Sequence, residues 1–444
     1  MPATIPKSDY RRRRTALMHL MAADSIAVIP AASGRIRNRD SEYLFRQDSD
    51  FHYLTGFNEP DAVLVLAPGR SHGEVILFCR ERHARSELYD GERLGPDRAA
   101  QIVGVDDAFP VADLDDILPG MLEGRERIYL GLGDHPEFEN RLLGWVSSLR
   151  ARESGGVRTP DELFALKHLL HEQRLIKSAA EIRCMREAAE ITCQGHLRAM
   201  RACEAGMTET QLEAELVYEF MRRGAKSTAY ASIVGGGANA CVLHYVDNAQ
   251  TLKKNDLVLI DAGCEYQLYA ADVTRTFPVS GRFSRQQQAL YEVVLAANQA
   301  AIEACRPGAV FETPHQAALE IMIQGLIDLE ILDGDPAEVL ETERYRTFCP
   351  HNTSHWLGLD VHDVGDYRVD GASRPLEPGM VLTIEPGIYL PPGESTAHLP
   401  VHFRGIGIRV EDDVLITADR PDVLTAAAPK TVAEIEAVMA EPRP

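Results

Sequence analysis

The chain has 444 residues, of which 45% are hydrophobic and 25% charged, and its 46 basic and 67 acidic side chains give a formal net charge of −21. This length allows about two to three domains, and the negative charge disfavours nucleic acid and anionic membrane surfaces as partners. No stretch reaches the roughly 18 uninterrupted apolar residues of a membrane span. The eight cysteines form no C-x-x-C pair, which predicts reduced thiols in a cytoplasmic protein.

Apolar runs in the first part of the chain predict four buried strands, and helical segments separate several of them. The runs span residues 26–29, 62–66, 75–78 and 127–130. This alternation favours an α/β layer architecture for an N-terminal domain of residues 1–172. Four consecutive arginines, residues 11–14, are expected to form a solvated face of the first helix rather than a targeting or binding patch.

A loop is predicted at residues 151–160, which contain two consecutive glycines and a proline. Residues 161–176 are then predicted to be helical. A longer helix is predicted from Ser178 to Ala205, because Ser178 and Glu181 can form a capping box and a glycine ends the run. We therefore place a second domain at residues 173–444.

This second domain carries an internal repeat, in which a helix is followed by strands, a histidine and a carboxylate at a strand end. The matched segments are 202–206 with 304–308, 242–244 with 360–362, and 252–263 with 376–387. In the last match, at an offset of 124 positions (376 − 252), Asp261 aligns with Glu385. Three matches in the same order predict a pseudo-symmetric domain with a site between its halves.

The first pair of candidate site residues is Asp261 and Asp272. Asp261 ends the apolar run 257–260, and Asp272 precedes the alternating segment 273–277. A hairpin would bring these carboxylates together, and buried carboxylates repel each other unless a cation or a proton lies between them. The alternative is a solvated turn acid and a structural acid that is bonded to Arg275.

The second pair is Glu385 and Glu411. Glu385 follows a predicted buried strand, residues 380–384, where the next residues, Pro and Gly, fix an extended backbone and allow a sharp turn. Glu411 alternates with Arg409 on one face of a predicted strand. The alternative for this second carboxylate is a surface ion pair between Arg409 and Glu411.

Histidines complete the set, since residues 349–363 contain His351, His355 and His362. One imidazole and four carboxylates form a site dominated by hard carboxylate oxygens, which suits Mn²⁺, with Co²⁺, Fe²⁺ or Zn²⁺ as alternatives. Four carboxylates balance the charge of two divalent cations, and a pair of such cations supports hydrolysis. The predicted metal ligands are Asp261, Asp272, His355, Glu385 and Glu411.

These residues closely resemble the metallopeptidases with the pita-bread fold, a family that includes aminopeptidase P, prolidase and methionine aminopeptidase. The resemblance covers about residues 170–425, and residues 37–40 and 57–60 extend it to the N-terminal domain of the Xaa-Pro aminopeptidases (aminopeptidase P). It implies an α/β N-terminal domain followed by an α+β pita-bread catalytic domain with internal pseudo-two-fold symmetry.

The resemblance also implies a role for each candidate. Asp261 and Asp272 would bind one metal ion and His355 and Glu385 the other, with Asp272 and Glu411 bridging the two. Glu385 would handle the proton of the attacking water. The residues that would contact the substrate are His244, His351, His362, Tyr389 and Arg409, and of these His244 and His362 would also act on the tetrahedral intermediate.

The implied function is removal of the N-terminal residue from peptides with proline at the second position, by a homodimer or homotetramer. Relatives place an aromatic residue of a neighbouring subunit beside the active site, and Tyr89 is the candidate here. The alternatives are a prolidase, which cleaves only Xaa-Pro dipeptides, a proline-independent aminopeptidase, and a binding module without activity.

Overall fold

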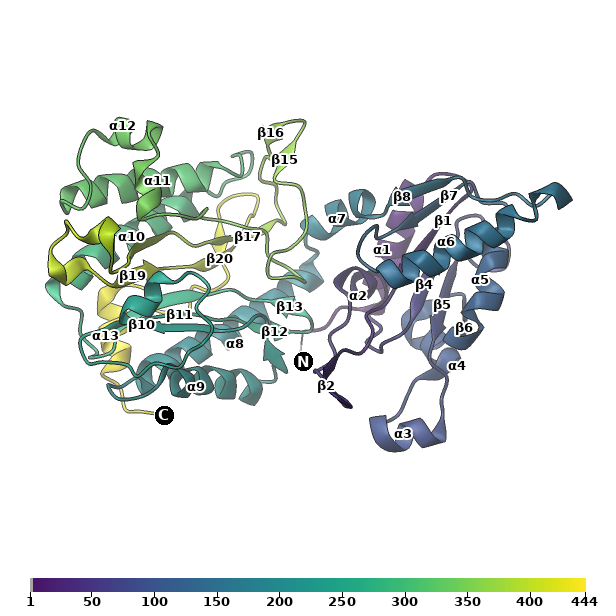
Figure 1. Cartoon of the computed structure of the whole chain (residues 1–444), viewed down its shortest axis with the longest axis horizontal. Helices are drawn as coiled ribbons and strands as arrows, with labels where there is room; N and C mark the ends of the chain where they lie inside the picture. The colour runs from purple at the N-terminus through teal and green to yellow at the C-terminus, as the bar shows by residue number, and fades with distance from the viewer. Residues whose placement is uncertain (1–2) are drawn as a thin grey trace. The chain divides into compact units, whose positions relative to one another are not determined.

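The computed structural model describes residues 3–444, which form two compact units (Figure 1). One unit comprises Ile5–Arg174, and the other comprises Leu175–Pro444 together with residues 3 and 4. Within residues 3–444, none of the eight cysteines takes part in a disulfide. Within the described part of the chain, none of the helices has the length and apolar character needed to cross a membrane.

The first unit is built on a six-stranded sheet in the order β6-β5-β4-β1-β7-β8. Its strands are β1 (Ser25–Pro30), β4 (Val63–Leu66), β5 (Val75–Cys79), β6 (Asp107–Pro110), β7 (Arg127–Leu130) and β8 (Glu162–Ala165). A separate hairpin is made by β2 (Ile36–Asn38) and β3 (Ser41–Glu42). The helices are α1 (Lys7–Leu20), α2 (Ser49–Thr55), α3 (Ala84–Asp90), α4 (Gly95–Ala99), α5 (Leu114–Leu122) and α6 (Pro136–Arg150). The four predicted strands are confirmed as β1, β4, β5 and β7.

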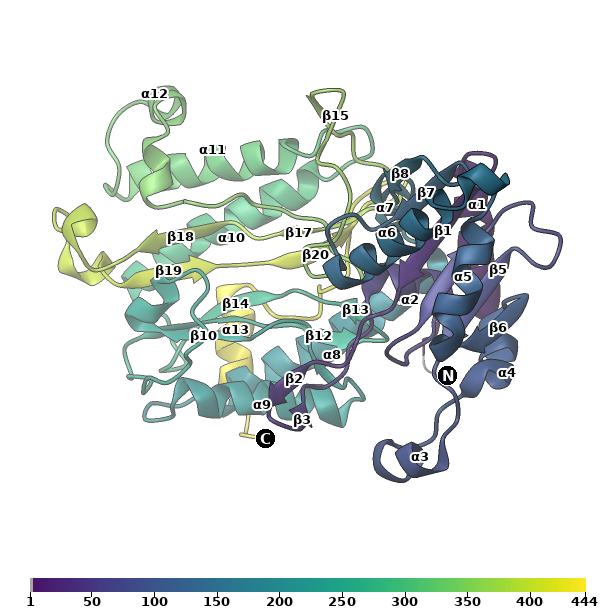
Figure 2. The ribbon, with the colours of Figure 1, turned by 45° about the vertical axis from the view of Figure 1, so that its right-hand side comes forward.

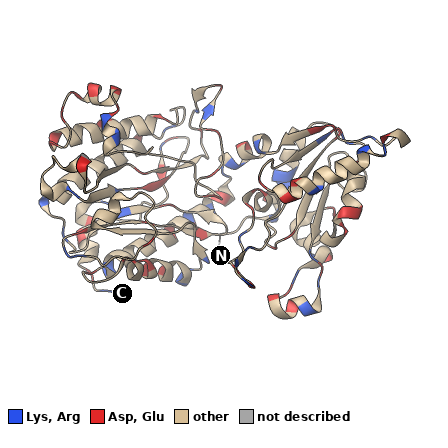
Figure 3. Ribbon diagram, viewed as in Figure 1, with Lys and Arg blue, Asp and Glu red and all other residues tan. Residues whose placement is uncertain are grey.

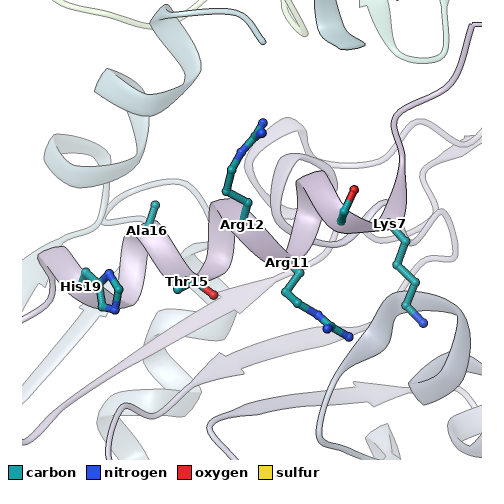
Figure 4. Close-up of a pocket in the computed structure, with 7 residues that line it drawn as sticks. Lys7, Arg11, Arg12, Thr15, Ala16 and His19 are labelled. Atoms are coloured by element: carbon teal, nitrogen blue, oxygen red, sulfur yellow. The ribbon is translucent and has the colours of Figure 1, made fainter. Parts of the chain in front are cut away.

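Two predictions in this unit are wrong. Residues 161–176 are not one helix, because β8 pairs in parallel with β7 before α7 (Lys167–Leu175) begins. The arginine run is also only half solvated: Arg11 and Arg12 are exposed along α1 (Figure 4), whereas Arg13 and Arg14 are 3% and 1% exposed. Arg13 donates to Tyr53 O at 3.0 Å, and Arg14 donates to Leu54 O at 2.7 Å. Both carbonyls belong to the last turn of α2, where helix carbonyls lack partners within the helix and attract cations.

The second unit places its strands between two helix pairs, α8 with α9 and α10 with α11 (Figures 1 and 2). The helices are α8 (Ala179–Ala202), α9 (Glu209–Arg222), α10 (Arg285–Ala304), α11 (Thr313–Asp328), α12 (Pro336–Glu341) and α13 (Val432–Met439). The first half contributes β9 (Ser227–Thr228), β10 (Ile233–Gly236), β11 (Leu257–Asp261), β12 (Cys264–Tyr266), β13 (Tyr269–Ala270) and β14 (Thr274–Pro278). The second half contributes β15 (Arg368–Val369), β16 (Ala372–Ser373), β17 (Val381–Ile384), β18 (Gly387–Leu390), β19 (Ile406–Arg409), β20 (Asp412–Leu415) and β21 (Asp422–Val423).

The predicted helix at residue 178 is confirmed with its capping box, since the Ser178 side chain accepts from Glu181 N, although α8 ends at Ala202. The internal repeat is visible in matched hydrogen bonds. Gly206 N donates to Leu252 O and Gly308 N donates to Leu376 O, both at 2.9 Å. The antiparallel pair β11–β14 of the first half corresponds to β17–β20 of the second. The pseudo-two-fold symmetry therefore brings equivalent strand ends to the centre of the unit.

Candidate metal centre

Asp261 and Asp272 meet at one end of the β11–β14 pair. Asp261 is the last residue of β11 and pairs with Thr274, two residues after Asp272. The hydroxyl of Tyr230 lies between the two side chains, 2.6 Å from Asp261 Oδ1 and also in contact with Asp272 Oδ1, so that its one hydrogen is shared between the two carboxylates. The hairpin predicted from sequence is therefore confirmed, with a tyrosine joining the two carboxylates.

Glu385 and Glu411 occupy the equivalent end of the β17–β20 pair. Glu385 directly follows β17, and Glu411 directly precedes β20. The backbone N–H of Glu411 donates to Thr274 O at 3.1 Å, and its Oε2 accepts from Thr274 Oγ1 at 2.7 Å. Thr274 opens β14, so these two bonds join the halves of the repeat and bring all four carboxylates to one place. Figure 3 shows acidic residues on these interior strands as well as on the outer helices.

His355 faces the same cluster. Its Nε2 lies 3.5 Å from Asp272 Oδ2 and 3.6 Å from Glu385 Oε1, while its Nδ1 lies 3.0 Å from Trp356 O. A backbone carbonyl at Nδ1 favours the tautomer that leaves Nε2 free to bind a metal ion. Ligand atoms of Asp272, His355 and Glu411 all lie within 4.8 Å of one another. This spacing suits a shared metal centre.

The electrostatics of the cluster follow from burial of like charges. Burial raises the pKa of Asp261, that of Glu385 to about 7, and that of Glu411 well above its ordinary value. Burial acts in the same direction on Asp272, but the hydrogen bond and charge of His355 outweigh it and hold the pKa of Asp272 below its usual value. Burial would lower the pKa of His355, yet its acidic neighbours raise it to about 9. Four carboxylates thus exceed the positive charge around them, and the residues fit two divalent cations.

A cavity of about 460 Å³ opens beside the carboxylates. Its lining includes all five predicted ligands and His244, His351, His362 and Arg409. The rings of His362 and His355 are 4.4 Å apart and nearly perpendicular. The apolar part of the wall is formed by Ile233, Leu243, Val246 and Val361. The histidines predicted to contact substrate therefore do line one cavity with the predicted ligands.

Tyr389 lies behind this wall rather than on it, because it is 3% exposed and is not among the lining residues. Its hydroxyl oxygen is 2.8 Å from His351 Nε2 and accepts from Arg409 Nη1 at 2.7 Å. Gly387 is required by this packing and not by a sharp turn, since a Cβ there would lie 2.5 Å from the Tyr389 hydroxyl oxygen. Tyr389 thus orients two side chains of the cavity.

The alternatives left open by the sequence are wrong in the structure. Arg275 pairs with Asp412 at 2.8 Å and not with Asp272, and Arg409 pairs with Asp261 at 2.5 Å and not with Glu411. Both arginines are buried.

Two residues near the metal centre were missed by sequence reasoning. Tyr230 follows no strand or helix pattern that would single it out. Asp413 accepts the backbone N–H of Asp272 at 3.2 Å, and its place in the acidic run 411–413 was the only available signal.

Comparisons with known proteins agree with this arrangement. The model of metallopeptidase family M24 matches residues 183–418, and the model of the aminopeptidase P N-terminal domain matches residues 10–129. The Xaa-Pro aminopeptidase of Escherichia coli K12 is 44% identical over 440 residues, which cover 99% of each chain. The structure of Pseudomonas aeruginosa aminopeptidase PepP is 54% identical, with a TM-score of 0.97 over 99% of each chain.

Aminopeptidase P from E. coli with the inhibitor Pro-Leu is 44% identical, with a TM-score of 0.94 over 98% of each chain. A zinc-substituted E. coli aminopeptidase P in complex with product has a TM-score of 0.95 at 44% identity over 98% of each chain. Matches of this extent leave one assignment: the chain belongs to metallopeptidase family M24 and, within it, to the Xaa-Pro aminopeptidases.

Proposed function

We propose that the chain removes the N-terminal residue from peptides that have proline at the second position. The observation that carries this proposal is the convergence of Asp261, Asp272, His355, Glu385 and Glu411 beside a cavity lined by further histidines and Arg409. Similarity to Xaa-Pro aminopeptidases along the whole chain, and the Pro-Leu inhibitor of one relative, support proline recognition.

The proposed ligand sets are Asp261 with Asp272 for one cation and His355 with Glu385 for the other, with Asp272 and Glu411 bridging. When bound, the two cations would polarise the scissile carbonyl and activate water. Carboxylate-rich sites favour Mn²⁺, and Co²⁺, Fe²⁺ or Zn²⁺ could replace it. The zinc-substituted relative supports such replacement.

The remaining cavity residues act on the substrate. Glu385 accepts a proton from the attacking water, since burial raises its pKa to about 7, close to the range that suits a general base. His244 and His362 donate hydrogen bonds to the developing oxyanion or pass a proton to the departing proline nitrogen. Arg409 and His351, held by Tyr389, bind the peptide beside the carboxylates.

The proposal extends to a cytoplasmic homodimer or homotetramer. On α3, Leu88 and Tyr89 are 79% and 77% exposed, so both side chains are accessible to a neighbouring subunit. Light scattering of the wild type and of Tyr89→Ala, combined with activity measurements, tests whether Tyr89 serves a neighbouring site.

The deciding experiment compares Xaa-Pro-Xaa tripeptides with Xaa-Pro dipeptides as substrates for protein stripped by chelator and reloaded with Mn²⁺. We expect metal-dependent release of the N-terminal residue from the tripeptides. Cleavage of dipeptides alone would identify a prolidase instead. No cleavage with any of the four metals would overturn the proposal and favour a binding module.

A further inference from the structure

His244 lies on the loop that connects β10 to β11. It is an exposed residue, and it belongs to the lining of the cavity. Within residues 3–444, the structure gives its imidazole no hydrogen-bond partner. The direction of this ring therefore depends on the backbone on either side of it.

Glu209, the first residue of α9, is completely buried and binds the loop through hydrogen bonds to both backbone and side-chain donors. Glu209 Oε1 accepts from Gly236 N at 2.8 Å and from Asn239 Nδ2 at 2.9 Å. Glu209 Oε2 accepts from Tyr245 Oη and from Gln250 N, both at 2.8 Å. The four donors come from residues 236–250, and two lie on each side of His244.

Burying a carboxylate costs free energy because the charge loses its hydration, and hydrogen bonds within the protein must replace the lost water contacts. Four charge-assisted bonds do this for Glu209, and each fixes one point of the loop. One of the four donors is the phenol of Tyr245, the residue that directly follows His244 in the chain. Glu209 therefore fixes the immediate neighbour of this histidine. Glu209 is not among the residues that line the cavity, so we expect it to act on the substrate only through the loop.

The loop's apolar side chains support the same geometry. Leu243 and Tyr245 pack against a cluster that contains Ile233, Leu259 and Tyr389, while His244 between them lines the cavity. At the far end, Asn248 has a positive φ of 46°, and its side chain accepts from Val234 N at 3.0 Å and donates to Ser232 O at 2.9 Å. The loop is therefore closed by one amide and held in its middle by one carboxylate.

We propose that Glu209 is the positioning residue for His244, setting the direction in which that imidazole meets the peptide. This inference rests on the proposed function, since it assigns a partner to one of its substrate-contacting histidines. It predicts that Glu209 acts on catalysis only through His244.

The test is a double-mutant cycle on kcat/KM for a Xaa-Pro-Xaa tripeptide with Mn²⁺-loaded, full-length protein. Glu209→Gln keeps the shape but cannot accept all four bonds, and it should lower kcat/KM about 10- to 100-fold. In the His244→Ala background the same change should alter kcat/KM by less than about 2-fold. Metal content should equal that of the wild type in every variant.

Glu219→Gln is the matched control. Glu219 is another buried glutamate on α9, but its carboxylate binds Arg222 and Arg223 and not the loop, so kcat/KM should stay within about 2-fold of the wild type. If Glu209→Gln does not fold, Tyr245→Phe decides, because it removes one donor only. It should cost about 5-fold in the wild-type background and nothing without His244.

Three results separate the claims. An inactive wild type overturns the proposed function. If the wild type is active and Glu209→Gln has the same kcat/KM, the positioning role is overturned. Where Glu209→Gln does not fold, an unchanged kcat/KM for Tyr245→Phe overturns it instead. Losses that multiply in the cycle show that Glu209 acts independently of His244, and this result also rejects the inference.

Discussion

Arg275 is the residue whose replacement should do most damage to the framework of the metal centre. Its side chain is completely buried and donates to five oxygen atoms. These are Asp412 Oδ1 at 2.8 Å and the backbone carbonyls of Thr274 (2.9 Å), Glu411 (2.5 Å), Ala428 (3.0 Å) and Pro429 (3.1 Å). Arg275→Met keeps much of the volume and removes every one of these bonds.

The expected loss follows from the ion pair. Removing one partner of a buried pair costs about 3–5 kcal/mol. Lys430 still lies 2.7 Å from Asp412 and offsets part of the buried charge that loses its arginine partner, so we expect a loss of about 3–4 kcal/mol. Residues 175–444 form a unit of 270 residues (444 − 175 + 1), whose unfolding entropy is about 0.57 kcal/mol/K at ~2.1 cal/mol/K per residue. The Tm of this unit should therefore fall by about 5–7 °C.

Differential scanning calorimetry on chelator-treated protein measures this change without a contribution from metal binding. The matched control is Arg282→Met, which removes an arginine that is 77% exposed and pairs with Glu436 at 2.7 Å. A surface pair contributes about 0–1 kcal/mol, so the control should shift the Tm by at most about 2 °C. An Arg275→Met variant that melts with the control would refute the reasoning.

Three further predictions concern the site and the first unit. Glu411→Ala should abolish hydrolysis and lower the number of metal ions bound per chain. Near-normal turnover with full metal content would contradict the dinuclear assignment. His362→Ala should lower kcat by about 100-fold or more with metal content unchanged, whereas a defect fully explained by metal loss would reject its role. Burial, aided by Arg13 and Arg46, lowers the pKa of His52 to about 3, so the folded state resists protonation and loses stability as the pH falls below about 6.5. The unfolding free energy of His52→Gln relative to the wild type, measured by urea unfolding, should therefore rise by about 2 kcal/mol from pH 7 to pH 5. The same free-energy difference at both pH values would contradict the lowered pKa of His52.

Two of the four carboxylates were readily predictable because each stands where a strongly apolar run stops. Asp261 and Glu385 end buried strands, and a charge at such a position requires a partner. The repeat offset is a second, independent signal, since it aligns these two residues with each other at equivalent strand ends. Local sequence was sufficient here because strand ends and their register place the side chains.

Other features depend on contacts that sequence patterns do not encode. Arg13 and Arg14 look like solvated charges, and they are buried by contacts with distant segments, namely the last turn of α2 for both and Gly104 for Arg14. Tyr230 joins two ligands, but its segment carries no periodicity. The strand β8 was taken for helix because its pairing with β7 comes from distant sequence, and such pairing outweighs local propensity.

The repeat also explains why the centre has one imidazole and not two. Thr383 N donates to His355 O at 3.0 Å, and the offset of 124 maps Thr383 onto Leu259 (383 − 124 = 259). The residue opposite Leu259 on β10 is Gly235, which is therefore the counterpart of His355. A Cβ at Gly235 would lie 2.9 Å from the backbone nitrogen of Ala240, so no side chain fits there. The symmetry is thus broken by packing, and the two proposed cation positions receive different ligands although the halves that supply them share one fold.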